Sequence, residues 1–414
     1  MMKIADTSTP VVILKLEHYG SLGIMRSLGR LGVPVFGIDS DAAAPAFSSR
    51  YCRGKFVVDC EGVDPEQAID TLLCIGRMIG RPAILIPTSD EMAMLVAEGA
   101  DLLQQTFMFQ HNDPALVRSL ASKKEMYALA RTHGIPTAET FFPESLQEVV
   151  EYAMSAAYPV MLKGIDGGKL VKRTGKKMLI CRSKGELLDA YETMEDPSGP
   201  NIMLQEYIPG GDDAIWMFNG YFDEQSECIA GYTGKKIRQN PVYTGMTSLG
   251  ICLKNDCVAS LTKSFMKAIG YRGILDIGYR FDSRDGTLKV LDVNPRIGAT
   301  FRLFVGRDGM DVARALYLGL TGQPVPHDEA PEGRKWIVED KDIVSCVRYS
   351  LDGALRFGEW LGSYRGVREA GYFSFDDFLP FASMCAGHIR RRFFGMTPRY
   401  TSDPFIPSST PTYA

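Results

Sequence analysis

The chain has 414 residues, of which 45% are hydrophobic and 23% charged, and its formal net charge is −4. This composition is typical of a globular protein with about two to four domains, and the acidic balance excludes nucleic acid as the main partner. No apolar run reaches the roughly 18 residues of a membrane span, and residues 1–10 lack the apolar core of a signal peptide. We therefore expect a cytoplasmic protein.

Nine cysteines and five histidines are scattered along the chain. The chain contains no Cys-x-x-Cys pair, the cysteine count is odd, and no two histidines have the spacing of metal ligands. This pattern favours reduced thiols over a disulfide framework or a zinc site.

The first third of the chain alternates short apolar runs with helical stretches. The apolar runs cover residues 11–16, 33–38 and 83–86, and a helical pattern covers residues 22–31. Asp64-Pro65 has the form of a helix N-cap followed by a proline at the first helical position. Apolar strands that alternate with helices predict a parallel sheet covered on both faces, which is a doubly wound domain.

The middle of the chain mixes helix and strand signals without strict alternation, which predicts an α+β region. Ser-x-x-Glu sequences predict helix starts at Ser122, Ser145 and Ser183. Predicted strands cover residues 160–162, 178–181, 202–205, 214–218 and 228–232. From Thr397 the chain is rich in Pro, Ser and Thr, and we expect this tail to be disordered.

An acidic pair near residue 290 is the most informative feature. In Asp292-Val293-Asn294-Pro295-Arg296, side-chain alternation along a strand places Asp292 and Asn294 on one face. A turn at 282–286 joins this strand to one that contains Asp276, and the resulting β-hairpin brings Asp276 toward Asp292. Paired carboxylates repel unless a cation lies between them, so this is a candidate Mg²⁺ site. A solvent-facing acidic strand end is the alternative.

Two lysines are candidates for binding an anion. Lys123 falls in the first turn of the helix predicted at Ser122, where a cation opposes the helix dipole. Either its ammonium is solvated, or the ammonium and the helix end bind an anion together. Lys163 ends an apolar strand, where a lysine seldom lacks a partner.

The segment after Lys163 is rich in glycine and includes Gly167 and Gly168. Glycines allow backbone N–H groups to surround a phosphate, so we expect residues 164–177 to form a loop that closes over a phosphate-bearing ligand. The alternative is an exposed turn with solvated lysines.

Two further segments carry weaker signals. The connector at residues 205–213 is a weak candidate for binding a nucleoside. Its backbone groups could bind an adenine edge and a carboxylate could bind ribose, although a plain turn fits the pattern equally. The residues concerned are Gln205, Glu206, Tyr207, Ile208, Asp212 and Asp213. Alternation places Lys236 and Arg238 on one face, either to bind a phosphate or substrate carboxylate or as a basic outer sheet face. Arg302 is a further candidate near the substrate.

The order of these motifs along the chain resembles that of the ATP-grasp superfamily, and most closely its carboxylate–amine ligase branch. The resemblance covers roughly residues 1–325 and includes Gly134-Ile135-Pro136 after the first helix of the motif set. It implies an α/β and α+β fold, in which an N-terminal doubly wound domain precedes a two-lobed ATP-grasp fold and a C-terminal extension. The implied parts are residues 1–115, a small lobe at 116–200, a large lobe with the metal site at 201–325, the extension at 326–396 and the tail at 397–414.

The resemblance also implies roles for the candidate residues. Lys123 and Lys163 would hold the α- and β-phosphates of ATP, the backbone of residues 206–208 would bind adenine, and Asp212 or Asp213 the ribose. Asp276, Asp292 and Asn294 would coordinate Mg²⁺, with Mn²⁺ as an alternative ion, and Arg296 would steady the transferring phosphoryl group. The family commonly has Glu at the position of Asp292, which leaves open whether one or two metal ions bind.

The implied reaction forms an amide or peptide bond through an acyl phosphate, and it releases ADP and phosphate. The partners would be a small carboxylic acid and an amine, with amino acids, peptides and metabolite acids all open, and the protein a monomer or homodimer. A non-catalytic ATP-binding regulator is one alternative. A dinucleotide-dependent oxidoreductase is another, but Gly20 and Gly23 do not complete its Gly-x-Gly-x-x-Gly fingerprint. The aromatic segment at 373–394 either packs as a capping helix, which we favour, or contacts a membrane surface.

Overall fold

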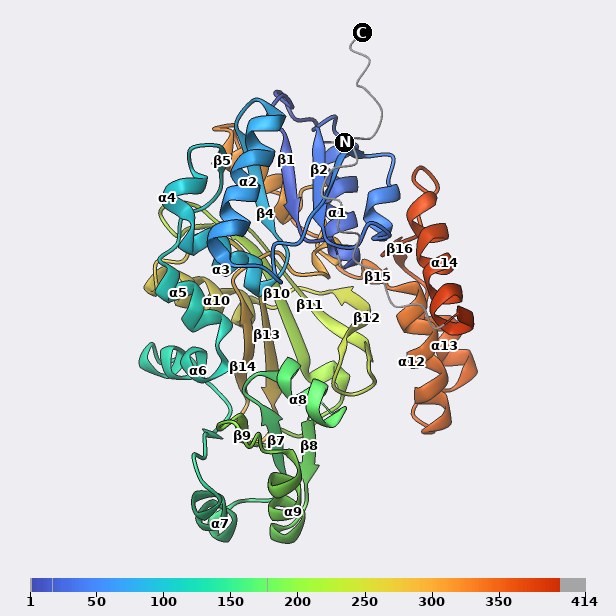
Figure 1. Ribbon diagram of the computed structural model, residues 1–414. Coiled ribbons are helices and arrows are strands. Elements are labelled where there is room, and N and C mark those ends of the chain that lie inside the picture. Colours follow the sequence, from blue (N-terminus) through green and yellow to red (C-terminus); the bar gives the residue numbers. More distant parts are fainter. Residues whose placement is uncertain (1, 17, 177, 395–414) are drawn as a thin grey trace. The chain divides into compact units, whose positions relative to one another are not determined.

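The computed structural model describes residues 2–16, 18–176 and 178–394 (Figure 1). The expected disorder of residues 397–414 concerns positions outside the described residues, and Lys177, the last residue of the loop predicted at 164–177, also lies outside them. The chain forms two compact units, which we call unit 1 (Met1–Val117, Trp216–Asp276 and Asn294–Ala414) and unit 2 (Arg118–Ile215 and Ile277–Val293). The units are not continuous in sequence, and the predicted domain boundaries stay predictions.

Unit 1 contains a parallel five-stranded sheet with the strand order β3-β2-β1-β4-β5. Its strands are β1 (Val11–Leu14), β2 (Val35–Asp39), β3 (Cys52–Val57), β4 (Ala83–Pro87) and β5 (Phe107–Met108). The accompanying helices are α1 (Tyr19–Gly29), η1 (Pro45–Ser48), α2 (Pro65–Ile79), α3 (Asp90–Glu98), α4 (Ala100–Leu103) and α5 (Pro114–Ala121). Ile13 and Leu14 lie in two different apolar cores, so both sheet faces are covered and the predicted doubly wound arrangement is confirmed.

Unit 2 contains an antiparallel four-stranded sheet with the order β6-β9-β7-β8. Its strands are β6 (Thr140–Phe141), β7 (Val160–Gly164), β8 (Met178–Cys181) and β9 (Ile202–Glu206), and its helices are α6 (Lys123–Thr132), α7 (Leu146–Ser155), α8 (Gly167–Thr174) and α9 (Lys184–Met194). Apolar residues of α7 and α9 form one core with the sheet. The predicted helix starts are confirmed, because Ser122, Ser145 and Ser183 each accept a hydrogen bond from the backbone N–H of the glutamate three residues later.

The predicted glycine-rich loop after Lys163 is wrong in its form, because helix α8 occupies most of it. The carboxylate of Asp166 accepts a hydrogen bond from the backbone N–H of Lys169 and caps the helix. Gly175 ends the helix with a φ of 70°, a conformation that favours glycine. The flanking cap residues therefore decide the structure here, and Gly167 and Gly168 form the first turn of the helix.

A third sheet has seven strands in the order β14-β13-β10-β11-β12-β15-β16. Its strands are β10 (Ile215–Phe222), β11 (Cys228–Asn240), β12 (Met246–Cys252), β13 (Gly273–Asp282), β14 (Thr287–Asn294), β15 (Lys335–Ile337) and β16 (Val367–Ala370). The short helix η2 (Asp212–Ala214) precedes β10, and α10 (Asp256–Ala268), η3 (Phe301–Leu303) and α11 (Val312–Leu320) lie between later strands of the sheet. The turn between β13 and β14 confirms the predicted hairpin, with Gly286 at a φ of 74°.

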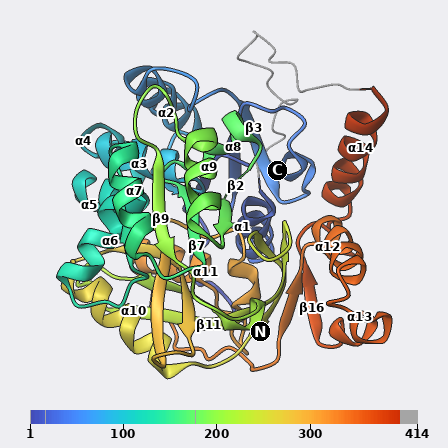
Figure 2. The same ribbon diagram turned by 90° about the horizontal axis from the view of Figure 1, so that it is seen from below.

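The C-terminal part of unit 1 contains α12 (Glu339–Leu351), α13 (Phe357–Ser363) and α14 (Leu379–Phe394), which lie near one another in Figures 1 and 2. Helix α14 contacts η1 and buries Pro380 and Met384, which confirms the favoured packing of this segment. Asp377, which lies just before α14, forms a buried ion pair with the guanidinium of Arg26 in α1 at 2.9 Å.

The nine cysteines all lie among the described residues and are free thiols. Within the part of the chain that the structure describes, no helix combines the length and apolar character needed to cross a membrane.

Candidate functional site

A chain of hydrogen bonds in unit 2 starts at the ammonium of Lys163, at the end of β7. Lys163 Nζ donates to Gln205 Oε1 at 2.7 Å, and Gln205 Nε2 donates to the hydroxyl of Tyr127 and to Thr140 Oγ1, both at 2.9 Å. The hydroxyl of Tyr127 in turn donates to the backbone carbonyl of Leu291 at 3.1 Å. Gln205 is 1% exposed, so this amide uses both of its ends in the protein interior.

The same chain of bonds ends next to Asp292, the residue after Leu291 in β14. Burial raises the pKa of Tyr127, and the negative charge of Asp292 adds to the effect. The hydroxyl therefore stays protonated and keeps its donor role. Within unit 2, Gln205 and Tyr127 thus fix a lysine at one strand end relative to an acid-bearing strand. Sequence patterns gave no sign of Tyr127.

Lys123 contacts the backbone at the end of β7. Its ammonium donates to the carbonyls of Gly164 and Ile165 at 3.0 and 3.1 Å. A β-carbon at Gly167 would lie 3.5 Å from this ammonium, so Lys123 reaches the first turn of α8. A helix N-terminus and an ammonium in one place favour an anion.

The carboxylate of Glu206, at the end of β9, belongs to an ion network of unit 2. It binds Lys289 at 2.7 Å and Arg284 at 2.6 Å, and accepts a hydrogen bond from the backbone N–H of Glu139. Burial alone would raise the pKa of Glu206, but these bonds outweigh burial and lower it. The side chain of Glu206 therefore has a structural role, which leaves only its backbone for the predicted contact with adenine.

Arg280 fixes the connector that follows β9. Its guanidinium donates to the carbonyl of Ile208 at 2.9 Å and to that of Gly210 at 2.5 Å. Tyr207 is half-buried, and Asp212 and Asp213 begin the short helix η2, with Asp213 exposed to solvent. The connector is thus held at its carbonyls by a cation that the sequence did not single out.

In unit 1, Asp276 of β13 has two asparagine neighbours. Asn219 Nδ2 donates to Asp276 Oδ1 at 2.6 Å, and Asn294 Nδ2 donates to the backbone carbonyl of Asp276 at 3.2 Å. Asn219 Oδ1 is buried and has no hydrogen-bond partner among the described residues. A β-carbon at Gly298 would lie 2.5 Å from the carboxylate carbon of Asp276, so only glycine leaves room for this acid.

Arg296 links Asn294 to the start of helix α3 in unit 1. Its Nε pairs with Asp90 Oδ1 at 2.9 Å, and its Nη2 donates to Asn294 Oδ1 at 3.2 Å. Asp90 is the first residue of α3 and follows the carboxyl end of β4. Ligands of parallel α/β sheets bind at this end of the strands.

Asp292 lies opposite a glycine as well, since a β-carbon at Gly278 would lie 2.4 Å from Asp292 Oδ1. Along β14, Val293 is buried whereas Asp292 is exposed and Asn294 is half-buried, in agreement with the expected alternation. Within unit 1, Asp276, Asn294 and Asn219 carry oxygen donors, and this chemistry fits a hard cation such as Mg²⁺. Among residues with described positions, no three His, Cys, Asp or Glu side chains form a metal cluster.

The structure does not bring Lys236 and Arg238 together on a ligand-binding face. The pairing of β11 with β12 shifts register on both sides of Arg238, which breaks the alternation that the prediction assumed. Lys236 Nζ donates to Gln239 Oε1 and the carbonyl of Gly245, whereas Arg238 forms a bidentate pair with Asp342 at 2.9 and 2.7 Å. Arg238 is 3% exposed, so we remove it from the proposed site.

Arg302 is also not where we expected it. Its guanidinium pairs with Asp311 and, at 2.7 Å, with Glu369, in a buried ion cluster of unit 1. The arginine is 6% exposed, and this ion cluster engages its guanidinium.

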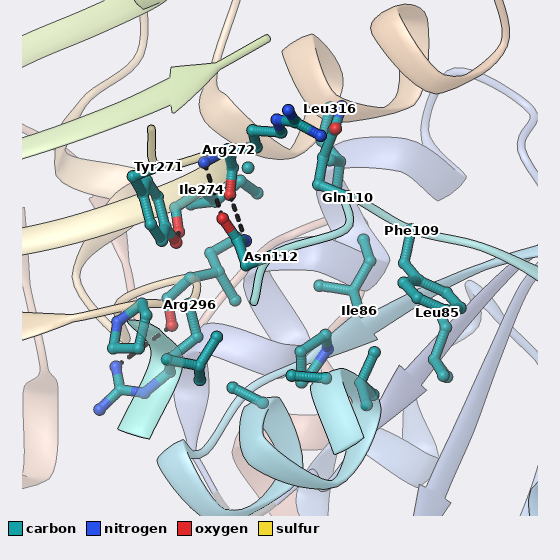
Figure 3. A pocket seen from close by; sticks show the side chains of 18 residues that line it. Leu85, Ile86, Phe109, Gln110, Asn112, Tyr271, Arg272, Ile274, Arg296 and Leu316 are labelled. Atoms are coloured by element: carbon teal, nitrogen blue, oxygen red, sulfur yellow. Dashed lines mark hydrogen bonds between the residues drawn. The ribbon is translucent and has the colours of Figure 1, made fainter. Parts of the chain in front are cut away.

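A small cavity of unit 1 lies beside Arg296 (Figure 3). Its volume is about 70 Å³, and most of its lining is apolar, such as Ile86 and Leu316. Asn112 closes one wall through paired bonds with the backbone of Arg272, at 2.7 and 2.9 Å. Ligand pockets usually measure about 300–1,000 Å³, so this cavity does not hold a nucleotide.

Comparison with known proteins found no matching family model. The chain is 24% identical to the D-aspartate ligase of Enterococcus faecium (strain Aus0004) over 289 residues, which are 66% of this chain and 68% of that one. Its fold is similar to that of an N5-carboxyaminoimidazole ribonucleotide synthetase in its ADP complex, with a TM-score of 0.62, 13% identity and coverage of 81% and 82% of the two chains.

The fold is also similar to the biotin carboxylase domain of the 2-oxoglutarate carboxylase of Hydrogenobacter thermophilus, crystallised with MgADP, ADP and bicarbonate. The TM-score is 0.58 at 16% identity, and the match covers 80% of this chain and 74% of that one. These likenesses agree with the resemblance carried by the motifs from Lys123 to Arg296. The chain therefore has the ATP-grasp fold.

Proposed function

We propose that this protein is an ATP-dependent carboxylate–amine ligase. The observation that carries the proposal is the hydrogen-bond chain in unit 2 from Lys163 through Gln205 and Tyr127 to Leu291, which fixes a lysine relative to the strand of Asp292. The similarity to D-aspartate ligase supports the reaction class. Structures of similar fold with ADP and MgADP support ATP as the phosphoryl donor and Mg²⁺ as its ion.

In this proposal, the nucleotide is held by groups from unit 2. Lys123 and Lys163 hold the α- and β-phosphates, helped by the first turn of α8 at Gly167 and Gly168. The backbone of residues 206–208 contacts adenine, and Asp212 or Asp213 accepts hydrogen bonds from the ribose.

The metal and the transferred group are assigned to the acidic strands. Asp276, Asp292 and Asn294 would hold Mg²⁺, which when bound neutralises part of the negative charge of the phosphates. Arg296 is held by Asp90 and Asn294 and donates to the transferring phosphoryl group. Lys236 remains a candidate for binding the substrate carboxylate.

The reaction has two steps. A carboxylate oxygen of the acid attacks the γ-phosphorus of ATP, which yields an acyl phosphate and ADP. The nitrogen of an amine then attacks the acyl carbon, phosphate leaves, and the nitrogen loses a proton. The protein contributes positioning and charge stabilisation, since phosphoryl transfer needs little covalent help.

The substrates would be small molecules, with an amino acid as the first choice in view of D-aspartate ligase. The free thiols support a reducing compartment, and we assign the protein to the cytoplasm.

A screen of ADP release over pairs of carboxylic acids and amines tests the proposal. With hydroxylamine as the amine, an active acid yields a hydroxamate that reports the acyl phosphate directly. We expect Asp292→Ala to abolish both signals, and Asp189→Ala, which removes an exposed acid of α9, to leave both unchanged. ATP binding by calorimetry without ADP release or hydroxamate for any acid would instead identify a non-catalytic ATP-binding protein.

A further inference from the structure

Helix α12 has its polar and apolar faces reversed. The residues that it buries are Asp342, Ser345, Cys346 and Tyr349. Its exposed side carries Ile343, Val344, Val347 and Leu351, whose exposed fractions are 56%, 60%, 48% and 76%. A helix at a protein surface normally buries its apolar stripe and exposes its polar one.

Specific bonds hold the polar face inward. Asp342 receives both arms of the Arg238 guanidinium and a hydrogen bond from Ser248 at 3.0 Å. The hydroxyl of Ser345 donates to the carbonyl of Gln239 at 2.7 Å, and the helix packs on β11 and β12. Rotation of α12 to hide its apolar side would break this buried ion pair, so the apolar side stays outside.

The next helix, α13, also exposes apolar side chains. Phe357 and Leu361 lie one turn apart on that helix and are 67% and 55% exposed. Figures 1 and 2 both show α12 and α13 side by side. We call Ile343, Val344, Val347, Leu351, Phe357 and Leu361 the outer stripe. Exposed apolar side chains gathered on two adjacent helices mark an interaction site.

Exposed cations outnumber exposed acids in the segment that carries the outer stripe. Between residues 339 and 370 the exposed charged side chains are five cations, Lys341, Arg348, Arg356, Arg365 and Arg368, and two acids, Asp352 and Glu359. Two of these cations have acidic neighbours, since Lys341 pairs with Asp340 at 3.6 Å and Arg348 with Asp352 at 3.4 Å. Asp342 and Glu369 instead bind buried arginines, so the exposed side chains of the segment keep an excess of cations.

We propose that the outer stripe docks onto an anionic lipid bilayer. Apolar side chains of a surface helix enter the boundary between headgroups and acyl chains, while flanking Lys and Arg bind anionic headgroups. A second copy of the chain fits less well, because a twofold axis through the stripe would place its cations against the same cations of the partner. The docking concerns a surface of unit 1 and does not depend on the ligase reaction.

Flotation of the full-length protein with vesicles tests the proposal. We expect binding to vesicles of equal parts phosphatidylcholine and phosphatidylglycerol, and much weaker binding to phosphatidylcholine alone. The double variant Val347→Ser and Leu351→Ser should lose at least about tenfold in vesicle affinity. Added salt of about 0.5 M should weaken binding of the unmodified protein, because it screens the headgroup charge.

Met154→Ser is the matched control, since Met154 is 74% exposed on α7 of unit 2 and lies outside the stripe. It should float like the unmodified protein, and the thermal midpoints of both variants should stay unchanged because only exposed side chains are altered. No flotation with anionic vesicles, or equal flotation of the stripe variant, would overturn the proposal. A dimer in light scattering that the stripe variant converts to monomers would also overturn it and assign the stripe to a second copy of the chain.

Discussion

Lys163 and Arg238 are two cations that the sequence marks as ligand-binding residues, and the structure gives them opposite surroundings. The ammonium of Lys163 is held at 2.7 Å by the neutral amide of Gln205. The guanidinium of Arg238 is held by the carboxylate of Asp342, and the two side chains are 4% and 0% exposed. Both contacts fix a cation in place, but the contact of Lys163 is with a neutral amide and the contact of Arg238 is with an anion.

This difference separates a positioning contact from a structural one. A bond from Gln205 orients Lys163 without opposing an incoming phosphate, whereas an anion that approached Arg238 would have to compete with Asp342. Loss of Lys163 should therefore affect turnover, and loss of Arg238 should affect stability. Four measurements, from the largest expected effect to the smallest, examine this distinction.

Arg238→Ala leaves the carboxylate of Asp342 buried without its partner, and removal of one member of a buried ion pair costs about 3–5 kcal/mol. We expect the free energy of unfolding, measured with urea, to fall by this amount. Arg356→Ala removes an exposed arginine of the same unit and should change it by less than about 0.5 kcal/mol. Unchanged stability of Arg238→Ala would mean that the Asp342 pair contributes nothing.

Lys163→Ala should lower the rate of ADP release by about 10²–10³-fold, since in the proposed site it removes a positive charge that binds the phosphates. The urea midpoint should change little, because the side chain is only partly buried. Lys172→Ala, on the exposed side of α8, serves as the control and should keep full activity. If Lys163→Ala retains full turnover, Lys163 is not a catalytic residue.

Tyr127→Phe removes the hydroxyl that accepts from Gln205 and donates to Leu291. A buried donor left without a partner costs about 1–3 kcal/mol, and we expect roughly tenfold slower ADP release as Lys163 loses its fixed position. Tyr158→Phe also removes a hydrogen-bonded hydroxyl of unit 2, to the carbonyl of Ala153, but outside this chain of bonds. Equal effects of the two variants on turnover would contradict the positioning role of Tyr127.

Acid should weaken unit 2 through the network of Asp282 and Glu206. Hydrogen bonds from Arg284 lower the pKa of Asp282 against the opposing effect of burial, and bonds from Lys289 and Arg284 lower that of Glu206 despite its burial. Both pKa values lie below the unfolded values of about 4, so the network stabilises the fold above about pH 5 and loses this contribution as the pH falls. The urea midpoint of the unmodified protein should fall between pH 6 and pH 3. The midpoint of Lys289→Met should fall less steeply over the same range.

Features that depend on neighbouring residues could be predicted from the sequence. The helix starts at Ser122 and Ser145, the strand that begins at Val11 and the hairpin with Asp276 and Asp292 rest on short patterns, and the structure has each of them. The segment at Gly167 shows the limit of such patterns. Its glycines favour a loop, but the cap residues Asp166 and Gly175 on either side stabilise a helix.

Features that depend on residues far apart in the chain could not be predicted. Gln205 meets Tyr127 across 78 positions, and Asn219 meets Asp276 across 57, with no periodicity that relates them. The register shift in β11 that turns Arg238 away from its expected face is also invisible in the residue pattern. The motif residues were therefore easier to find than the neutral residues that orient them.

The ion pair between Arg26 and Asp377 has a consequence for synthesis on the ribosome. Its two members are separated by 351 positions, so the first helix of the nascent chain holds an uncompensated arginine until almost the whole protein has emerged. A buried cation without its counter-ion is costly, and the amino-terminal sheet with its helices cannot reach its final packing early. Translation of the last helices is thus the step that completes the first domain, and truncated products that end before residue 377 should be substrates for chaperones and proteases.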